Sequence, residues 1–302
     1  MVDRLRETTV SPGGPGPMLA QETAEPGSTS LDVGATPAKW RDPNKLRSLL
    51  HSTWPVLVVA LAWQAFAYSG HFPRILTPTL GDIWQALVRL EEQGTLWVHI
   101  GSTMARMSVG FAIAAVCGSV VGMSMAYWKW AERFFGPILS LLMPIPGLAW
   151  VPLFILWFGL GNLPTVMLVA FVSTLPIASN VWMGVRSANP IWLRAASSMN
   201  ASGLFLFRKV IFPAAMPSVL TGLRIGLAQA WRSVVAGEFV ANTQVGLGWL
   251  IFNSIAFLQS DVMFAGIFLI AVIGFLLERV VIQRVERLTV EKWGMVQKAG
   301  AA

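Results

Sequence analysis

The chain has 302 residues, of which 55% are hydrophobic and only 12% charged, and its formal charge is +7 at pH 7. A soluble domain usually carries about 25% charged residues, and it could not hide this much apolar surface with so few charges outside. The composition therefore excludes a soluble enzyme, a nucleic-acid-binding domain and a disordered scaffold as descriptions of the whole chain. The single cysteine excludes a disulfide framework or a cysteine-rich metal site.

Residues 1–45 differ from the rest, with six prolines, five glycines and no hydrophobic run. Such a segment cannot bury enough apolar surface to offset the entropy of ordering, so we expect a disordered cytoplasmic tail. It is not a signal peptide, because no apolar core follows its early arginines. We expect a transmembrane domain over residues 46–290 and a second cytoplasmic tail over 291–302.

Charge-poor apolar segments follow the tail, and a helix needs about 20 residues to cross about 30 Å of hydrocarbon. The 52 residues between Arg133 and Arg186 hold no charge. They are too many for one span, and the turn-forming run 159–164 divides them in two. The sequence therefore predicts an all-α polytopic membrane protein with six transmembrane helices, near residues 50–69, 103–127, 135–158, 163–185, 212–238 and 262–282.

Residues 239–260 also lack charges, but seven Asn, Thr, Gln and Ser side chains argue against exposure to lipid. We expect an outer loop here, either outside the membrane or partly inserted into it. With six spans, 17 of the 22 Lys and Arg residues fall on one side and two on the other, with three inside spans. Cytoplasmic segments carry such an excess, so both termini are predicted to be cytoplasmic.

Two spans carry small residues every four positions, which places each set on one helix face. The rows are Gly110, Ala114, Gly118, Gly122 and Ala126, and Ala214, Ser218, Gly222, Gly226 and Ala230. Small residues let membrane helices approach closely. We expect packing within one chain, and a subunit interface stays open.

The third predicted span contains prolines at 144, 146 and 152, which remove backbone hydrogen bonds and bend the helix. Lipid tolerates the freed carbonyls only where protein or a watery cavity satisfies them. Pro144, Pro146 and Trp150 therefore either line a translocation pathway or form a kink that fits its neighbours.

Residues 186–211 hold four cations and no acid. Asn189 and Pro190 are typical of a helix start, and we expect a short helix over 191–202 that stops at Gly203. Its apolar flanks suit insertion into the groove of a partner. A basic helix resting on anionic lipid is the alternative.

This loop resembles the coupling motif of the integral-membrane permease subunits of bacterial ABC importers. That motif has Glu-Ala-Ala, three residues, Gly, nine residues, Ile, one residue and Leu-Pro. The resemblance implies contact with an ATPase at Arg194, Ala195, Ala196, Asn200, Ala201, Ser202, Gly203 and Pro213. Arg194 replaces the acid of the motif. Asn200 replaces its glycine, and because Asn tolerates left-handed backbone angles the turn can persist.

The resemblance covers roughly residues 50–293. The runs 144–161 and 213–224, the pair Gly237-Glu238, and the runs 246–248 and 261–266 look like the aliphatic-sulfonate, taurine and nitrate branch. It implies two permease copies around a pathway, each inserting its loop into a cytoplasmic ATPase, with a periplasmic binding protein delivering substrate. No Gly-Lys pair occurs in the chain, so it has no P-loop. We therefore expect no bound cofactor and ATP hydrolysis by a separate subunit.

Ionisable residues within spans are functional candidates by default. Arg106 lies near the outer end of the second span, where we expect it to reach for the interface. Arg224, Arg232 and Glu238 lie in the fifth span, and we expect at least one of the two cations to face the bundle interior. They either line the path of an anion or form a structural ion pair. The three histidines show no ligand spacing, so no metal is assigned.

These features predict an inner-membrane ABC importer permease, acting as a homodimer in the lipid bilayer, for a small organosulfonate or related anion. Nitrate, a thiamine-precursor pyrimidine or an aromatic acid would keep the same family. An ion-coupled secondary transporter would show internal inverted repeats, which the sequence lacks. An intramembrane enzyme would need a catalytic constellation, and none is found.

Overall fold

The computed structural model describes residues 43–201 and 203–282. Most of both predicted tails and Ser202 lie outside the described residues. Within these ranges the chain is helical and contains no strand. In order, its elements are α1 (Pro43–Tyr68), α2 (Leu80–Glu92), α3 (Thr95–Tyr127), α4 (Lys129–Leu142), the 3-10 turn η1 (Gly147–Trp150), α5 (Val151–Phe158), α6 (Asn162–Arg186), α7 (Pro190–Ser198), α8 (Gly203–Leu206), the π-helical η2 (Phe207–Ile211), α9 (Phe212–Val240), α10 (Leu247–Ala256), α11 (Ser260–Leu276) and the π-helical η3 (Leu277–Ile282). All contacts discussed below lie within residues 54–282.

Four described helices are long and apolar enough to cross a membrane: Thr95–Tyr127, Asn162–Arg186, Phe207–Val240 and Ser260–Arg279. They correspond to the second, fourth, fifth and sixth predicted spans. The second begins at Thr95, eight residues before the predicted residue 103, and its first two turns contain the polar side chains of Thr95, His99 and Ser102. For the first predicted span, the described apolar part, Leu57–Tyr68, is shorter.

The third predicted span is not one helix. α4 ends at Leu142, and the 3-10 turn and α5 continue in a direction that differs by 103°. The prolines explain the interruption, because neither Pro144 nor Pro146 can donate a backbone hydrogen bond. The two pieces together are long and apolar enough for a broken span or a re-entrant segment.

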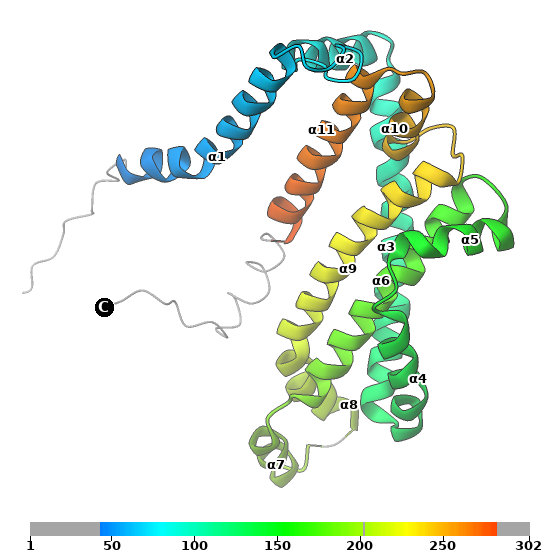
Figure 1. The fold of residues 1–302 in the computed structure, drawn as a ribbon. Coiled ribbons are helices and arrows are strands. Elements are labelled where there is room, and N and C mark those ends of the chain that lie inside the picture. The colour runs from blue at the N-terminus through cyan, green and yellow to red at the C-terminus, as the bar shows by residue number, and fades with distance from the viewer. Residues whose placement is uncertain (1–42, 202, 283–302) are drawn as a thin grey trace, which may run out of the picture. The chain divides into compact units, whose positions relative to one another are not determined.

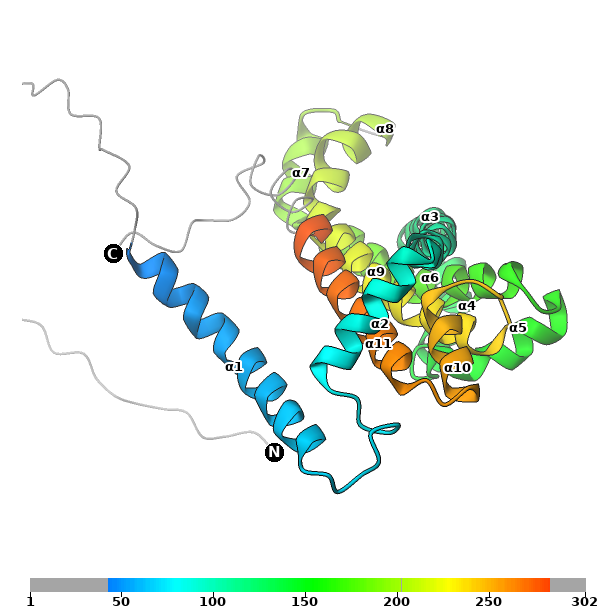
Figure 2. The ribbon, with the colours of Figure 1, turned by 90° about the horizontal axis from the view of Figure 1, so that it is seen from above.

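α6 lies at the centre of the bundle, with α3 and α9 packed along it (Figure 1, Figure 2). Both predicted rows of small residues face α6. A Cβ added to Gly118 of α3 would lie 2.8 Å from Ile177, and one added to Gly226 of α9 would lie 2.7 Å from the same side chain. The expectation that these rows pack within one chain is therefore confirmed.

α2 was missed at the sequence level, because the segment between the first two spans carries charges and has no long apolar run. Thr79 caps its start: the Thr79 hydroxyl accepts from the backbone N–H of Asp82, and the Asp82 carboxylate accepts from the backbone N–H of Thr79. This Thr-x-x-Asp capping box was the available signal.

α10 occupies the segment that was expected to be an outer loop. Its ten residues span about 15 Å, too short to cross a bilayer. Leu247, Leu250 and Ile251 are buried, while Phe252 and Ile255 are exposed. The described structure thus contains no seventh span in this segment, in agreement with the prediction.

The packing of α3 on α6 yields a matched test within one helix. Gly122→Ala would place a Cβ 2.4 Å from the carbonyl oxygen of Ala178, whereas Gly101→Ala enters open space. Both changes raise helix propensity equally, so the difference between them isolates the clash. We expect Gly122→Ala to lower the free energy of unfolding by about 1–3 kcal/mol and Gly101→Ala not to lower it, as measured by thermal unfolding in detergent. Equal shifts in the melting temperature would contradict this packing.

Candidate functional site

The most buried charge in the described structure is Glu238, close to the end of α9 that meets α10. Glu238 is 0% exposed and Arg106 of α3 is 7% exposed. Nη1 of Arg106 donates to Oε1 of Glu238 at 2.5 Å, and the Thr103 hydroxyl donates to Oε2 at 2.9 Å. An unpaired charge here would be very costly, so these contacts make the burial of Glu238 possible.

The first turn of α10 supplies the remaining donors. The backbone N–H of Gly248 donates to Oε2 of Glu238 at 3.0 Å, and that of Leu247 donates to the Thr103 hydroxyl at 2.9 Å. The first N–H groups of a helix lack partners within it and favour a negative charge nearby. The carboxylate of Glu238 therefore acts as an anion bound at the start of α10.

Two glycines are needed for this approach. A Cβ on Gly248 would lie 2.4 Å from the carbonyl oxygen of Val235. Gly246 has a φ of 147°, which side-chain-bearing residues rarely adopt, and a Cβ there would lie 2.5 Å from the Glu238 carboxylate. The spacing of Gly237-Glu238 and Gly246-Leu-Gly248 in the sequence thus has a direct structural cause.

Further contacts extend the network to α6. Nε of Arg106 donates to Oδ1 of Asn162 at 2.8 Å, in the first turn of α6. The backbone N–H of Gly246 lies 3.0 Å from Nδ1 of His99, whose ring stacks on Trp249. We call Thr103, Arg106, Glu238, Gly246 and Gly248 the α10 clasp, because together they tie α10 to α3, α6 and α9.

The clasp changes two sequence-based expectations. Arg106 does not reach for the interface, and that prediction is wrong, because Glu238 offers a buried partner. The carboxylate of Glu238 is shielded from the surface of the single chain and forms an ion pair with Arg106, as one of the two predicted alternatives has it. Periodicity along α9 could not reveal the pair, since the two residues are 132 positions apart in different helices.

The break between α4 and α5 contains the three remaining residues that were predicted to line a pathway. Pro144 and Pro146 are exposed, and Trp150 is partly buried with its ring against Phe171 of α6. A Cβ on Gly147 would lie 3.1 Å from the Ser233 hydroxyl of α9. The break therefore packs on α9 at Ser233, the residue that follows Arg232 in the sequence.

Both cations of α9 lie on the outside of the single-chain bundle. Arg232 is exposed, and its Nη2 donates to Oε1 of Gln229 on its own helix at 2.6 Å. Nη2 of Arg224 lies 3.4 Å from Oε1 of Glu278, with side chains 46% and 62% exposed. Within the single chain neither side chain is buried, whereas Arg106 of α3 is.

The segment 186–211 lies at the opposite end of the bundle from α2 and α10 (Figure 1). Oδ1 of Asn189 accepts from the N–H of Ile191 at 2.8 Å, which confirms the predicted helix start. The helix ends at Ser198, four residues earlier than expected. The helix was predicted to stop at Gly203, but the turn that ends it is made by Asn200, which has a φ of 59°.

The turn after α7 has the geometry of a Schellman motif. The N–H of Ala201 donates to the carbonyl of Ala196 at 3.0 Å across the left-handed Asn200. The prediction that Asn in place of Gly preserves this turn is confirmed. Arg194 and Ala195 are exposed, Ala196 and Ala201 are half-buried, and Gly203 opens α8, while Pro213 lies at the start of α9.

Large apolar side chains cover the same end. Ile191, Trp192, Met199 and Phe205 are all exposed, with Met199 at 84%. Arg194, Arg208 and Lys209 are exposed beside them. An exposed apolar patch with a cationic rim is typical of an interaction surface.

Comparison with known proteins agrees with this architecture. Residues 116–287 match the family of binding-protein-dependent transport system inner membrane components. The taurine transport system permease protein TauC of Escherichia coli is 34% identical over 80% of this chain and 88% of its own length. An aliphatic sulfonates permease, SsuC of the same organism, is 34% identical over 78% of this chain and 88% of its own.

The solved structures give the same fold. The MetNI methionine ABC transporter in an inward-facing form matches 65% of this chain and 98% of its own chain, with a TM-score of 0.55 and 20% identity. The family match and the relatives together show that this chain belongs to the binding-protein-dependent inner membrane components. It is a multi-pass permease subunit of an ABC importer.

The α10 clasp predicts strong coupling between Glu238 and Arg106. Glu238→Leu leaves a buried guanidinium unpaired, and we expect a loss of about 3–5 kcal/mol in the free energy of unfolding. Arg106→Leu should cost a similar amount, whereas the double variant should lose less than the sum of the two, because it leaves no charge unpaired. Thermal unfolding in detergent measures the loss for all three variants. A double variant whose loss equals the sum of the two single losses would show that Glu238 and Arg106 do not stabilise each other.

Proposed function

We propose that this permease imports a small organic anion, with taurine or another aliphatic sulfonate as the first candidate. The names of the taurine and sulfonate relatives support this cargo. A bicarbonate permease of Synechococcus elongatus, 31% identical over 87% of this chain, supports an inorganic anion as the second candidate. All three cargoes are small, and sulfonate and bicarbonate are anionic groups.

The observation that carries the proposal is the exposure of Arg232 within a span. Arg232 lies eight residues before the end of α9, about 12 Å along the helix. A guanidinium at this depth facing lipid is costly, so another surface or water covers it. A second copy of this chain, related by two-fold symmetry, would place the exposed faces of α9 and the break around a common path.

In that homodimer, Arg232 would offset part of the hydration that an anion loses on entering the path. Pro144, Pro146 and Trp150 would line the same path from the break. Arg224 would lie farther toward the other end of α9, paired with Glu278. Glu238 would act indirectly, by holding α9 and α10 in place through the clasp.

We place both termini and the α7 end of the bundle in the cytoplasm, from the distribution of cations along the sequence. The α2 end then faces outward, where a periplasmic binding protein delivers the substrate. A separate ATPase subunit binds and hydrolyses ATP, and this chain binds no cofactor. The exposed apolar side chains of the α7 end would enter a groove of that ATPase.

The cargo is tested in a strain of the host that lacks this permease, and the same strain is used for the Arg232 variants. We expect the deletion strain to stop growing on taurine or alkanesulfonates as the only sulfur source, and the wild-type gene to restore growth. Undiminished growth of the deletion strain on both would exclude this cargo.

Arg232→Ala should reduce taurine uptake at least tenfold, because an uncompensated anion must enter the path, whereas Arg232→Lys should retain most of it. Uptake of labelled taurine, normalised to the amount of permease in the membrane, is the measurement. Wild-type uptake by Arg232→Ala would remove this residue from the pathway.

The turn at Asn200 has its own test. Asn200→Gly keeps access to left-handed angles and should leave ATPase binding unchanged, whereas a β-branched residue is strained there. We expect Asn200→Val to reduce co-purification of the ATPase several-fold without lowering the amount of permease. Equal recovery with both variants would show that the turn does not position the coupling residues.

A further inference from the structure

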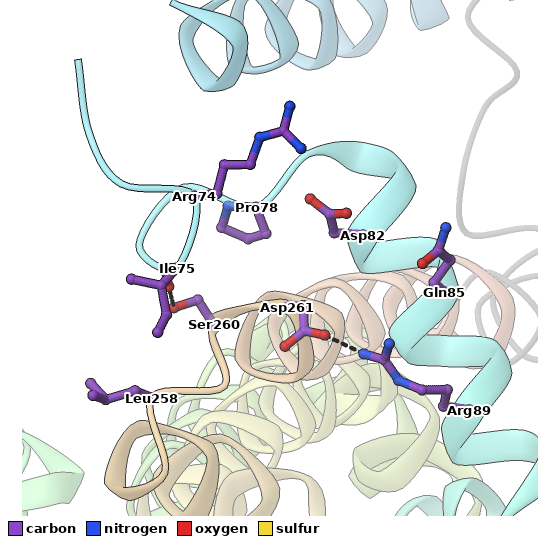
Figure 3. A pocket seen from close by; sticks show the side chains of 9 residues that line it. All are labelled: Arg74, Ile75, Pro78, Asp82, Gln85, Arg89, Leu258, Ser260 and Asp261. Carbon is purple, nitrogen blue, oxygen red and sulfur yellow. Dashed lines mark hydrogen bonds and ion pairs between the residues drawn. The ribbon is translucent and has the colours of Figure 1, made fainter. Parts of the chain in front are cut away.

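The α2 end of the bundle carries a polar pocket that is separate from the break and from the clasp. Its volume is about 240 Å³. The lining comes from the loop before α2, from one face of α2 and from the turn between α10 and α11 (Figure 3). The lining residues are Arg74, Ile75, Pro78, Asp82, Gln85, Arg89, Leu258, Ser260 and Asp261.

Two of the charged groups in the pocket are engaged by each other. Arg89 of α2 forms an ion pair with Asp261 in the first turn of α11, the dashed contact in Figure 3. Beside it, the Ser260 hydroxyl donates to the carbonyl of Ile75. These contacts hold the turn after α10 against α2 and its preceding loop.

The third charge, Asp82, is held by the helix cap. Its Oδ2 accepts from the backbone N–H of Thr79 at 2.9 Å and from the Thr79 hydroxyl at 2.8 Å. These two hydrogen bonds, with smaller contributions from the nearby charges of Arg74 and Arg89, keep the pKa of Asp82 below its usual value, so the carboxylate stays ionised at neutral pH. Both acids of the pocket therefore have donors already.

Arg74 is the exception among the four charges. Its side chain is exposed at the pocket (Figure 3), and within the described part of the chain no hydrogen bond or ion pair engages its guanidinium. Arg74 and Arg89 are also the two cations that the sequence places on the outer side. With Arg89 paired to Asp261, Arg74 is the cation whose donors remain available there.

We propose that this pocket is a docking point for the binding protein, which seats an acidic side chain on Arg74. The proposal rests on the proposed function, which places the α2 end outward and makes a binding protein the partner. A guanidinium binds a carboxylate with two parallel hydrogen bonds, which fixes orientation as well as affinity. The volume is many times the ~10–15 Å³ that a single water needs, so a carboxylate side chain and some ordered water fit.

The position of the pocket favours a protein side chain over the transported solute. None of its lining residues belongs to α4, α5 or α9, so a solute bound there would not be beside the break or Arg232. Its lining does include the turn that follows α10. A docked protein would therefore contact the turn at the C-terminal end of α10, while the α10 clasp holds the N-terminal end of the same helix.

The test compares two variants that change the outer charge by the same amount. Arg74→Gln removes a positive charge inside the pocket, whereas Gln93→Glu adds a negative charge at the exposed end of α2, outside the pocket lining. The permease–ATPase complex of each is placed in lipid nanodiscs. The probe is the purified taurine-binding protein of the same host, loaded with taurine, and its affinity is measured by surface binding at low and high salt.

We expect Arg74→Gln to raise the dissociation constant about five- to twentyfold at low salt, because the loss of an exposed charge at an interface slows association. The effect should shrink at 0.5 M NaCl, because salt screens exposed charges. Gln93→Glu should stay within twofold of wild type, and Arg74→Lys should recover part of the affinity. Equal elution of all variants in gel filtration confirms that they are folded.

Wild-type affinity of Arg74→Gln, or an equal loss with Gln93→Glu, would overturn the proposal. Taurine alone is titrated into nanodiscs without the binding protein, and binding that depends on Arg74 would assign the pocket to the solute instead. If the wild-type complex neither binds the probe nor supports taurine uptake, the proposed function fails. If wild type does both and Arg74→Gln matches it, only the docking point fails.

Discussion

A buried carboxylate is the constraint on which the outward half of this bundle depends. Glu238 is shielded from solvent, so it must find its donors within the protein. It finds them on two other helices: the guanidinium of Arg106 and the hydroxyl of Thr103 belong to α3, and the backbone N–H of Gly248 belongs to the first turn of α10. This requirement explains why α3 carries a buried threonine and a buried arginine at this level, and why glycines flank the start of α10.

The clasp also separates two roles along α9. Glu238 and Arg232 are six residues apart, which places them about 120° apart around the helix. One face of α9 is therefore fixed to α3 and α10 by a neutralised pair, while another presents a cation beside the break. Because the buried charges of Arg106 and Glu238 cancel each other, the electrostatic field on the outside of the bundle comes mainly from exposed charges, of which Arg232 is one.

The features that the sequence predicted correctly are local or periodic. Charge-free lengths located most spans, the four-residue rows predicted that Gly118 and Gly226 pack within the chain, and a cap and a left-handed Asn set the ends of α7. The missed features are long-range. The Arg106–Glu238 pair joins helices far apart in sequence, and prolines predict a bend without its 103° angle. α2 lacked an apolar run, so only its capping box could have marked it.

The packing also determines where the fold can change shape. α3 and α9 meet α6 at distances that leave no room for a single added carbon, and interiors packed this closely respond to displacement as rigid units. The break between α4 and α5 differs, because its prolines lack backbone donors and two of them are exposed. The packing therefore favours a transporter in which α3, α6 and α9 stay together while α4 and α5 adjust at the break, where Gly147 packs against Ser233 of α9.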